Sequence, residues 1–281
     1  MTPDPWYAAW VFDAPALLLL GGTSALYLRG RGRRHARGAP AQPRRTAAFL
    51  AGVAAGLLAL VTPIAAWSAH LFWVHMVQHL LLLVVAAPLL ALGEPVSTIR
   101  PVLPPAGRHA LARASRWSRR LRRGIGDPHP VLLATVVHIL ATWIWHAPVL
   151  YDAAVSNAGI HLLEHAAFLG TGVWFWSEIV AVARRDRRSR GLAPLCLGAL
   201  IATGGVLGAL LVFADRSLYA VYTGAGGLTA LEDQEFAGAL MWVPPSFVYA
   251  VVAIRLFVAW IDASDTELRA RERRERAAGR H

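Results

Sequence analysis

The chain has 281 residues, of which 56% are hydrophobic and only 16% are charged, and its formal net charge is +11. Soluble proteins carry about 25% charged residues, so this composition excludes an ordinary soluble domain and indicates an all-α integral membrane protein. The single cysteine, Cys196, excludes an internal disulfide and a cysteine-rich metal site. The apolar stretches follow one another without a dividing linker, which predicts one membrane domain.

Seven apolar segments are long enough to form transmembrane helices. In chain order they are residues 11–28, 46–67, 71–92, 128–147, 158–182, 192–213 and 236–261. Pro63 predicts a kink or a helix end near the close of the second segment. The sixth segment is rich in glycine and alanine, which favours close helix packing.

Short flanks border this seven-helix domain, which we place at residues 11–261. Residues 1–10 contain no basic residue, unlike a cleavable signal peptide, so we expect them to be retained. Residues 262–281 alternate arginine with acidic residues, which predicts a solvated helix or a disordered end.

The arginines lie on alternate connections between the apolar segments. Seven lie between the first and second segments, eight lie between the third and fourth, and others follow the fifth and seventh. The positive-inside rule therefore predicts an N-terminus outside the cell, seven transmembrane helices and a cytoplasmic C-terminus. Because the positive charge follows this topology, we expect no nucleic-acid partner. Residues 105–123 could form an amphipathic helix on the anionic leaflet of the lipid bilayer.

Seven histidines fall in the outer half of the membrane or at its outer edge in this topology. Two pairs, His75 with His79 and His161 with His165, are spaced four residues apart, which puts each pair on one helix face. Imidazole is the commonest protein ligand for transition metals, and polar groups in a membrane are costly. We therefore predict a metal site, and its candidate ligands are His70, His75, His79, His138, His146, His161 and His165.

Other side chains near these histidines could complete or orient the site. Gln78, Glu164 and Asp152 are candidate partners that orient imidazoles, and Glu164 could equally be a ligand. The thioethers of Met76 and Met241 are soft ligands of the kind that suits Cu(I).

Two other uses of the histidines remain open at this stage. A b-type haem could be held between two helices, with one axial ligand from each. The residues available for this are His75, His79, His138 and His165. The run from His161 to His165 also fits the H-x-x-E-H pattern of an inverted zinc peptidase, but a third ligand such as Glu178 would lie toward the opposite side. No paired nucleophile and base, phosphate loop or dinucleotide motif is visible, so we do not predict an enzyme.

Four stretches follow one another between residues 67 and 249. They are HMVQHLLLLVVAAPLLALGEP (75–95), WIWHAPVLYDAA (143–154), HLLEHAAFLGTGVWFW (161–176) and EDQEFAGALMWVP (232–244). These stretches resemble the signatures of the seven-helix CtaG family of cytochrome c oxidase assembly factors. The resemblance implies a multi-pass protein of the bacterial plasma membrane that helps to mature a haem-copper oxidase, plausibly by supplying copper to its catalytic subunit. The residues implied are His75, His79, Trp145, His146, Pro148, Tyr151, His161, Glu164, His165, Asp233, Gln234, Gly238, Met241 and Trp242.

We therefore expect the chain to bind copper and hand it over. Imidazoles from the two histidine pairs would hold the ion near the outer edge of the bundle, with His138 and His146 nearby. The acidic group at Asp233 would face the same side and attract the cation or dock an extracytoplasmic copper donor. Gln234, Met241 and Trp242 would complete this outer region.

Overall fold

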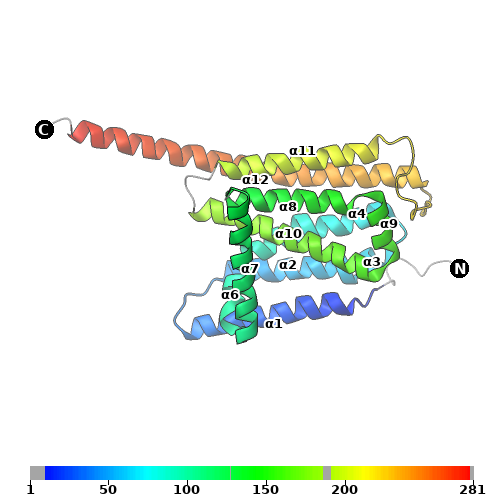
Figure 1. The fold of residues 1–281 in the computed structure, drawn as a ribbon, viewed down its shortest axis with the longest axis horizontal. Coiled ribbons are helices and arrows are strands. Elements are labelled where there is room, and N and C mark those ends of the chain that lie inside the picture. The colour runs from blue at the N-terminus through cyan, green and yellow to red at the C-terminus, as the bar shows by residue number, and fades with distance from the viewer. Residues whose placement is uncertain (1–9, 127, 186–190, 279–281) are drawn as a thin grey trace.

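The computed structural model describes residues 10–126, 128–185 and 191–278, and over these residues it is a bundle of helices without strands (Figure 1). This confirms the predicted all-α class. The helix α1 (Ala14–Ala36) begins where Asp13 accepts a hydrogen bond from the backbone N–H of Ala16, at 2.9 Å. The next helix, α2 (Pro43–Val61), stops just before Pro63, where α3 (Pro63–Trp67) begins. The predicted helix end at Pro63 is therefore confirmed.

The third apolar segment changes its helical geometry along its length. It consists of α4 (Phe72–Leu80), the π-helical η2 (Leu81–Ala86) and α5 (Ala87–Leu92). Pro88 lacks a backbone N–H and its ring crowds the carbonyl four residues earlier, so the wider π turns come just before it. One carbonyl in those turns, that of Leu83, instead accepts a hydrogen bond from the Trp176 indole at 3.2 Å. Such π turns are frequent at functional sites.

The middle of the chain surrounds α10 (Ala158–Arg185). The helix α8 (Pro130–Trp145) is followed by α9 (Pro148–Ser156), which is bent by 74° from it and lies across one end of the bundle (Figure 1). The sequence predicted only a connection there, but Pro148 starts a short helix. Buried side chains of α10 pack against neighbouring helices, and they include Phe175, Trp176 and Ile179.

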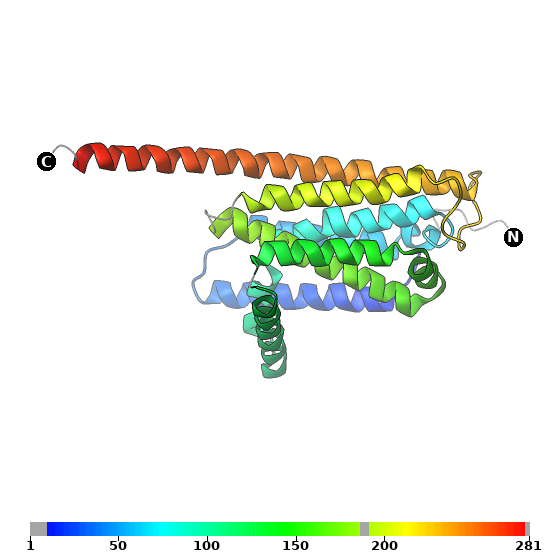
Figure 2. The same ribbon diagram turned by 45° about the horizontal axis from the view of Figure 1, so that its top comes forward.

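The helices α11 (Leu192–Val212) and α12 (Ala230–Ala278) lie side by side (Figures 1 and 2). Their backbones approach closely, since a Cβ added to Gly238 would lie 2.9 Å from the carbonyl oxygen of Gly208. The expected close packing of this glycine-rich segment is thus confirmed. A capping box between Thr229 and Glu232 starts α12 before the predicted position of residue 236. The helix then continues through the charged residues 262–278.

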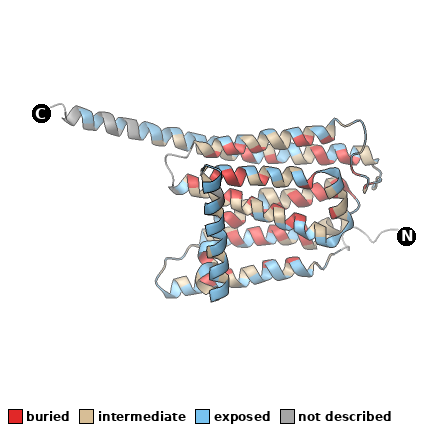
Figure 3. Cartoon of the chain, viewed as in Figure 1, coloured by how far each residue is buried: buried red, intermediate tan, exposed pale blue. Residues whose placement is uncertain are grey.

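The arginine-rich residues 29–45 and 100–123 lie at the same end of the bundle (Figure 1). The short helices α6 (Pro95–Ile99) and η3 (Arg100–Val102) lead into α7 (Pro105–Gly124), which lies across that end and is largely exposed (Figures 1 and 3). The predicted helix at 105–123 is thus confirmed. The opposite end carries α3, α9 and the loop at 213–229 (Figure 1).

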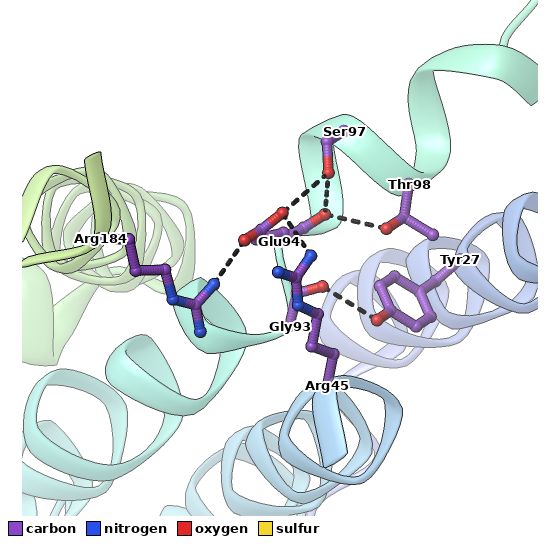
Figure 4. Close-up of polar contacts among 7 residues, drawn as sticks. All are labelled: Tyr27, Arg45, Gly93, Glu94, Ser97, Thr98 and Arg184. Atoms are coloured by element: carbon purple, nitrogen blue, oxygen red, sulfur yellow. Dashed lines mark hydrogen bonds and ion pairs between the residues drawn. The ribbon is translucent and has the colours of Figure 1, made fainter. Parts of the chain in front are cut away.

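Glu94 ties several helices together near the arginine-rich end (Figure 4). This residue has a left-handed backbone, with φ of 51°, and its carboxylate accepts hydrogen bonds from Arg45 at 2.8 Å and from Arg184. The adjacent carbonyl of Gly93 accepts a hydrogen bond from the Tyr27 hydroxyl at 2.9 Å. The turn between α5 and α6 is thus held to α1, α2 and α10.

Among the described residues, five helical stretches are long and apolar enough to cross a membrane, and the bent pair of α8 and α9 makes a sixth if it counts as one span. The five are Pro43–Trp67, Phe72–Leu92, Ala158–Arg184, Leu192–Val212 and Ala230–Thr266. The helix α1 packs in the same bundle but is not among them, and several arginines lie in its C-terminal part. A multi-pass helical protein is therefore supported, while the count of seven spans stays a prediction.

Candidate metal centre

The helices α4 and α10 bring the two histidine pairs against each other. His75 and His79 lie on α4, and both side chains are buried. His161 and His165 lie on α10, where His165 is buried and His161 is partly exposed. The ring centroids of His75 and His161 are 5.1 Å apart, and those of His79 and His165 are 5.7 Å apart. Four imidazoles from two helices therefore share one small region.

Glu164 lies among these rings and is fully buried. Its Oε2 is 3.8 Å from the Nε2 of His75, and its Oε1 is 3.8 Å from the Nε2 of His79. One ligand atom from each of four residues lies within 4.8 Å of the others, and we name these residues the histidine–carboxylate group: His75, His161, Glu164 and His165. Bonds of about 2.1 Å to one tetrahedral ion would place such atoms roughly 3.4 Å apart. A small inward movement would therefore let the group enclose a single cation.

The polar atoms that face this region lack hydrogen-bond partners. They are Nε2 of His75, both ring nitrogens of His79, Nε2 of His146, Nε2 of His161, Nε2 of His165 and both carboxylate oxygens of Glu164. Each buried polar group without a partner costs about 1–3 kcal/mol, and native proteins keep few of them. One bound cation would satisfy several at once, so these side chains fit a transition metal ion.

In His75 and His146, a hydrogen bond at Nδ1 leaves Nε2, on the other side of the ring, available as a metal ligand. The Nδ1–H of His146 donates to the carbonyl oxygen of Thr142 at 2.6 Å. The Nδ1 of His75 lies 2.9 Å from the hydroxyl of Tyr222, whose own hydrogen is donated to the carbonyl oxygen of Ser68 at 2.9 Å. His75 must therefore donate from Nδ1, which leaves the Nε2 lone pair facing Glu164. Orientation of this kind is common for metal-binding histidines.

The polar residues predicted to orient these histidines have other partners. Gln78 donates from Nε2 to the carbonyl oxygen of Ala59 at 3.0 Å, and its Oε1 is buried without a partner. Asp152 accepts hydrogen bonds from the backbone of the loop at 213–229, at 3.2 Å from Ala220. Gln234 binds the same loop, and its Oε1 accepts from the N–H of Leu218 at 2.6 Å. Asp152 and Gln234 thus hold the loop that carries Tyr222.

The sequence predicted that Asp233 would attract the cation or dock a copper donor, but the structure does not give it a free carboxylate. Asp233 is fully buried, and its carboxylate accepts hydrogen bonds from the backbone N–H groups of Phe72 at 2.8 Å and Trp73 at 2.9 Å. These N–H groups belong to the first turn of α4, where a helix needs acceptors. Asp233 therefore caps the helix that carries His75 and His79.

Four further predicted residues lie at the margin of the centre or away from it. His138 and Met241 line a cavity beside His79, and Trp242 packs against Gly205 and Gly208 of α11. His70 lies exposed in the turn before α4, beside Trp67, and the structure does not bring it into the buried group.

Tyr222, Tyr219 and Phe168 also belong to this region, although no motif in the sequence predicted them. Besides the Tyr222 bonds, the Tyr219 hydroxyl donates to the carbonyl oxygen of His146 at 2.9 Å. Burial raises the pKa of both tyrosine hydroxyls above the usual value, so they stay neutral donors. Phe168 packs on the ring of His79 with centroids 4.7 Å apart. Two tyrosines three residues apart, at 219 and 222, were a sequence signal that the loop at 213–229 could be part of the site.

The chain is similar to three mycobacterial proteins. An uncharacterized protein of Mycobacterium bovis and one of Mycobacterium tuberculosis are each 25% identical over 265 residues, which is 89% of this chain and 39% of each relative. A third, from Mycobacterium leprae, is 24% identical over 267 residues, covering 91% of the chain and 40% of the relative. The chain thus spans about two fifths of the length of these relatives. No solved structure matches it.

The model of one protein family, described as cytochrome c oxidase caa3 assembly factor (Caa3_CtaG), matches residues 25–263. This range includes all four members of the histidine–carboxylate group. The chain therefore belongs to the cytochrome c oxidase caa3 assembly factor family.

Proposed function

We propose that this protein binds copper in the histidine–carboxylate group and delivers it to the catalytic subunit of a haem-copper oxidase. The observation that carries the proposal is the buried Glu164 carboxylate, which has no hydrogen-bond partner and lies between imidazoles whose Nε2 atoms also lack partners. Copper is here the cargo of a binding protein, and no catalytic step on a substrate is needed. The family description supports the oxidase as the recipient.

The arrangement of the bundle supports delivery on the outer side of a bacterial plasma membrane. The arginine-rich connections lie at one end, which the positive-inside rule assigns to the cytoplasm. The histidine–carboxylate group lies nearer the other end, where α9 and the loop at 213–229 cover it. We propose seven spans with α1 as the first, an outer N-terminus and a cytoplasmic C-terminus. His161 is the most exposed member of the group, so copper from an extracytoplasmic donor would meet it first.

The geometry favours a single ion over the two alternatives that the sequence left open. The ring centroids of His161 and His165 are 4.1 Å apart, and those of His75 and His79 are 4.4 Å apart. The two rings of each pair are therefore close enough to bind the same ion. A haem would need an open slot for its flat macrocycle between two axial rings, whereas Glu164 lies between the rings here, with its Oε2 3.8 Å from the Nε2 of His75 and its Oε1 3.8 Å from that of His79. For the peptidase, Glu178 lies thirteen residues beyond His165 on α10, about 20 Å along the helix.

Metal analysis by mass spectrometry and an optical spectrum of the detergent-purified full chain test the proposal. We expect stoichiometric copper in the wild-type protein, fewer copper equivalents in His161→Ala/His165→Ala, and no Soret band. His109→Ala, on the arginine-rich helix α7, is the matched control and should bind as the wild type does. Haem iron with a Soret band, or equal copper in the His161→Ala/His165→Ala variant, would refute the proposal.

A further inference from the structure

A separate cavity of about 70 Å³ adjoins His79 between α4, α8, α11 and α12. This volume holds an ion and a few water-sized groups, and it is well below the roughly 300 Å³ of the smallest usual pockets for organic ligands. Five potential metal ligands line it, and we name it the methionine cavity: Met76, His79, His138, His146 and Met241. Three histidines and two methionines therefore line one small space.

Hydrogen bonds prepare two of these imidazoles as ligands. His146 donates from Nδ1 to the Thr142 carbonyl oxygen, as described above. The Nδ1 of His138 lies 2.9 Å from the Thr171 hydroxyl, which donates its own hydrogen to the Ala167 carbonyl oxygen at 2.8 Å. His138 therefore also donates from Nδ1, and its Nε2 carries the lone pair. His138 on α8 and His146, which directly follows that helix, are thus held in the tautomer that binds metal through Nε2.

An ion bound in the histidine–carboxylate group would leave both ring nitrogens of His79 and the Nε2 of His146 without a partner. Neither His79 nor His146 belongs to that group of four. Both side chains are nonetheless at most 4% exposed, and both nitrogens of His79 and the Nε2 of His146 lack partners. The ring centroids of these two histidines are 6.0 Å apart. A second cation between them and a thioether would satisfy atoms that the first cannot reach.

We infer that the methionine cavity is a second copper position, which takes Cu(I) through His79, His146 and a thioether of Met76 or Met241. Thioethers are soft ligands that select Cu(I), whereas the first position offers a harder carboxylate. His79 has one nitrogen 3.8 Å from Glu164 and also lines the cavity, so it can be a ligand on both sides. Copper would pass between the positions as Cu(I) by ligand exchange at His79, without electron transfer. The inference rests on the proposed copper-binding function.

Anaerobic titration of the full purified chain with Cu(I), against a competing chelator, tests the inference. We expect two equivalents in the wild-type protein and one in Met76→Leu/Met241→Leu, which nearly conserves side-chain volume. We also expect one equivalent in His161→Ala/His165→Ala, because the cavity would still bind. X-ray absorption at the copper edge should show a sulfur neighbour that disappears in Met76→Leu/Met241→Leu. The His109→Ala control should retain both equivalents and the sulfur signal.

The outcomes separate the inference from the proposal on which it rests. A wild-type protein with one equivalent, no sulfur neighbour and no change in Met76→Leu/Met241→Leu would overturn the second position and leave the proposed function standing. A wild-type protein that binds no copper would overturn both. Melting curves of each variant show whether the chain remains folded. Should Met76→Leu/Met241→Leu unfold, the sulfur signal of the wild-type protein still decides the question.

Discussion

At the scale of single residues, the proposed metal centre depends on hydrogen bonds that face away from it. Tyr222 is the main example, because its hydroxyl accepts from His75 and donates to the Ser68 carbonyl oxygen. It also lies 3.4 Å from the hydroxyl of Tyr151. These contacts fix which nitrogen of His75 carries its hydrogen and which way the ring points. Partners of this type commonly change metal affinity by about 10–100-fold when they are removed.

Replacing Tyr222 with phenylalanine should therefore lower copper affinity about tenfold while the number of bound ions stays the same. The ring remains to fill the space, but His75 loses its acceptor at Nδ1. Competition titrations with a copper chelator measure the change. Tyr27→Phe is the matched control, since it removes one hydrogen bond from a buried tyrosine at the other end of the bundle. Equal losses in both variants would mean that Tyr222 acts only through overall stability.

At the scale of helices, α4 carries two of the histidines and is held at both ends. Its first turn is capped by Asp233 of α12, and its last turn runs into the π-helical η2 before Pro88. The partner of the cap lies 161 residues away in sequence, so α12 and α4 must pack together before α4 can begin correctly. The acidic start of α12 is thus a structural support for the metal centre.

Asp233→Ala should lower the melting temperature of the purified protein and weaken copper binding at the same time. The change leaves two buried N–H groups at Phe72 and Trp73 without acceptors, at a cost of about 1–3 kcal/mol each. Glu235→Ala removes an exposed acid two residues away and should change neither property. If Asp233→Ala melts like the wild type but takes up copper more slowly from a donor, the docking role first expected for this residue would be restored.

At the scale of the whole molecule, the two ends of the bundle differ in chemistry. The outer end, in the proposed topology, contains the imidazoles and the loop at 213–229, which we name the tyrosine loop because it carries Tyr219 and Tyr222. The other end contains arginines, and Glu94 binds Arg45 and Arg184 there (Figure 4). Tyr27 stacks on Phe49 at the same end, with ring centroids 3.8 Å apart. The arginine-rich α7 crosses this end, as expected for a helix at an anionic membrane surface. Copper binding at the imidazole end and contact of α7 with the anionic leaflet at the arginine end together require one fixed orientation in the membrane.

Labelling of single cysteines in intact cells tests that orientation on a Cys196→Ser background. Thr223→Cys, in the exposed part of the tyrosine loop, should react with a membrane-impermeant maleimide. Ala114→Cys, on an exposed position of α7, should react only after the membrane is opened. This difference is expected because the positive-inside rule places the arginine-rich α7 on the cytoplasmic side of the membrane. Reaction of both sites, or of Ala114→Cys alone, in intact cells would contradict the proposed topology.

Most of the helices and the histidine pairs on common helix faces could be predicted from the amino-acid sequence. These features follow from hydropathy and from spacings of a few residues, which act locally along the chain. The positions of Glu164 between α4 and α10, of Asp233 as a cap and of His70 outside the buried group came from the tertiary structure. It also decided that Tyr222 binds His75 across 147 residues of sequence. Such contacts depend on which helices pack together and how each is rotated, and no local pattern records either.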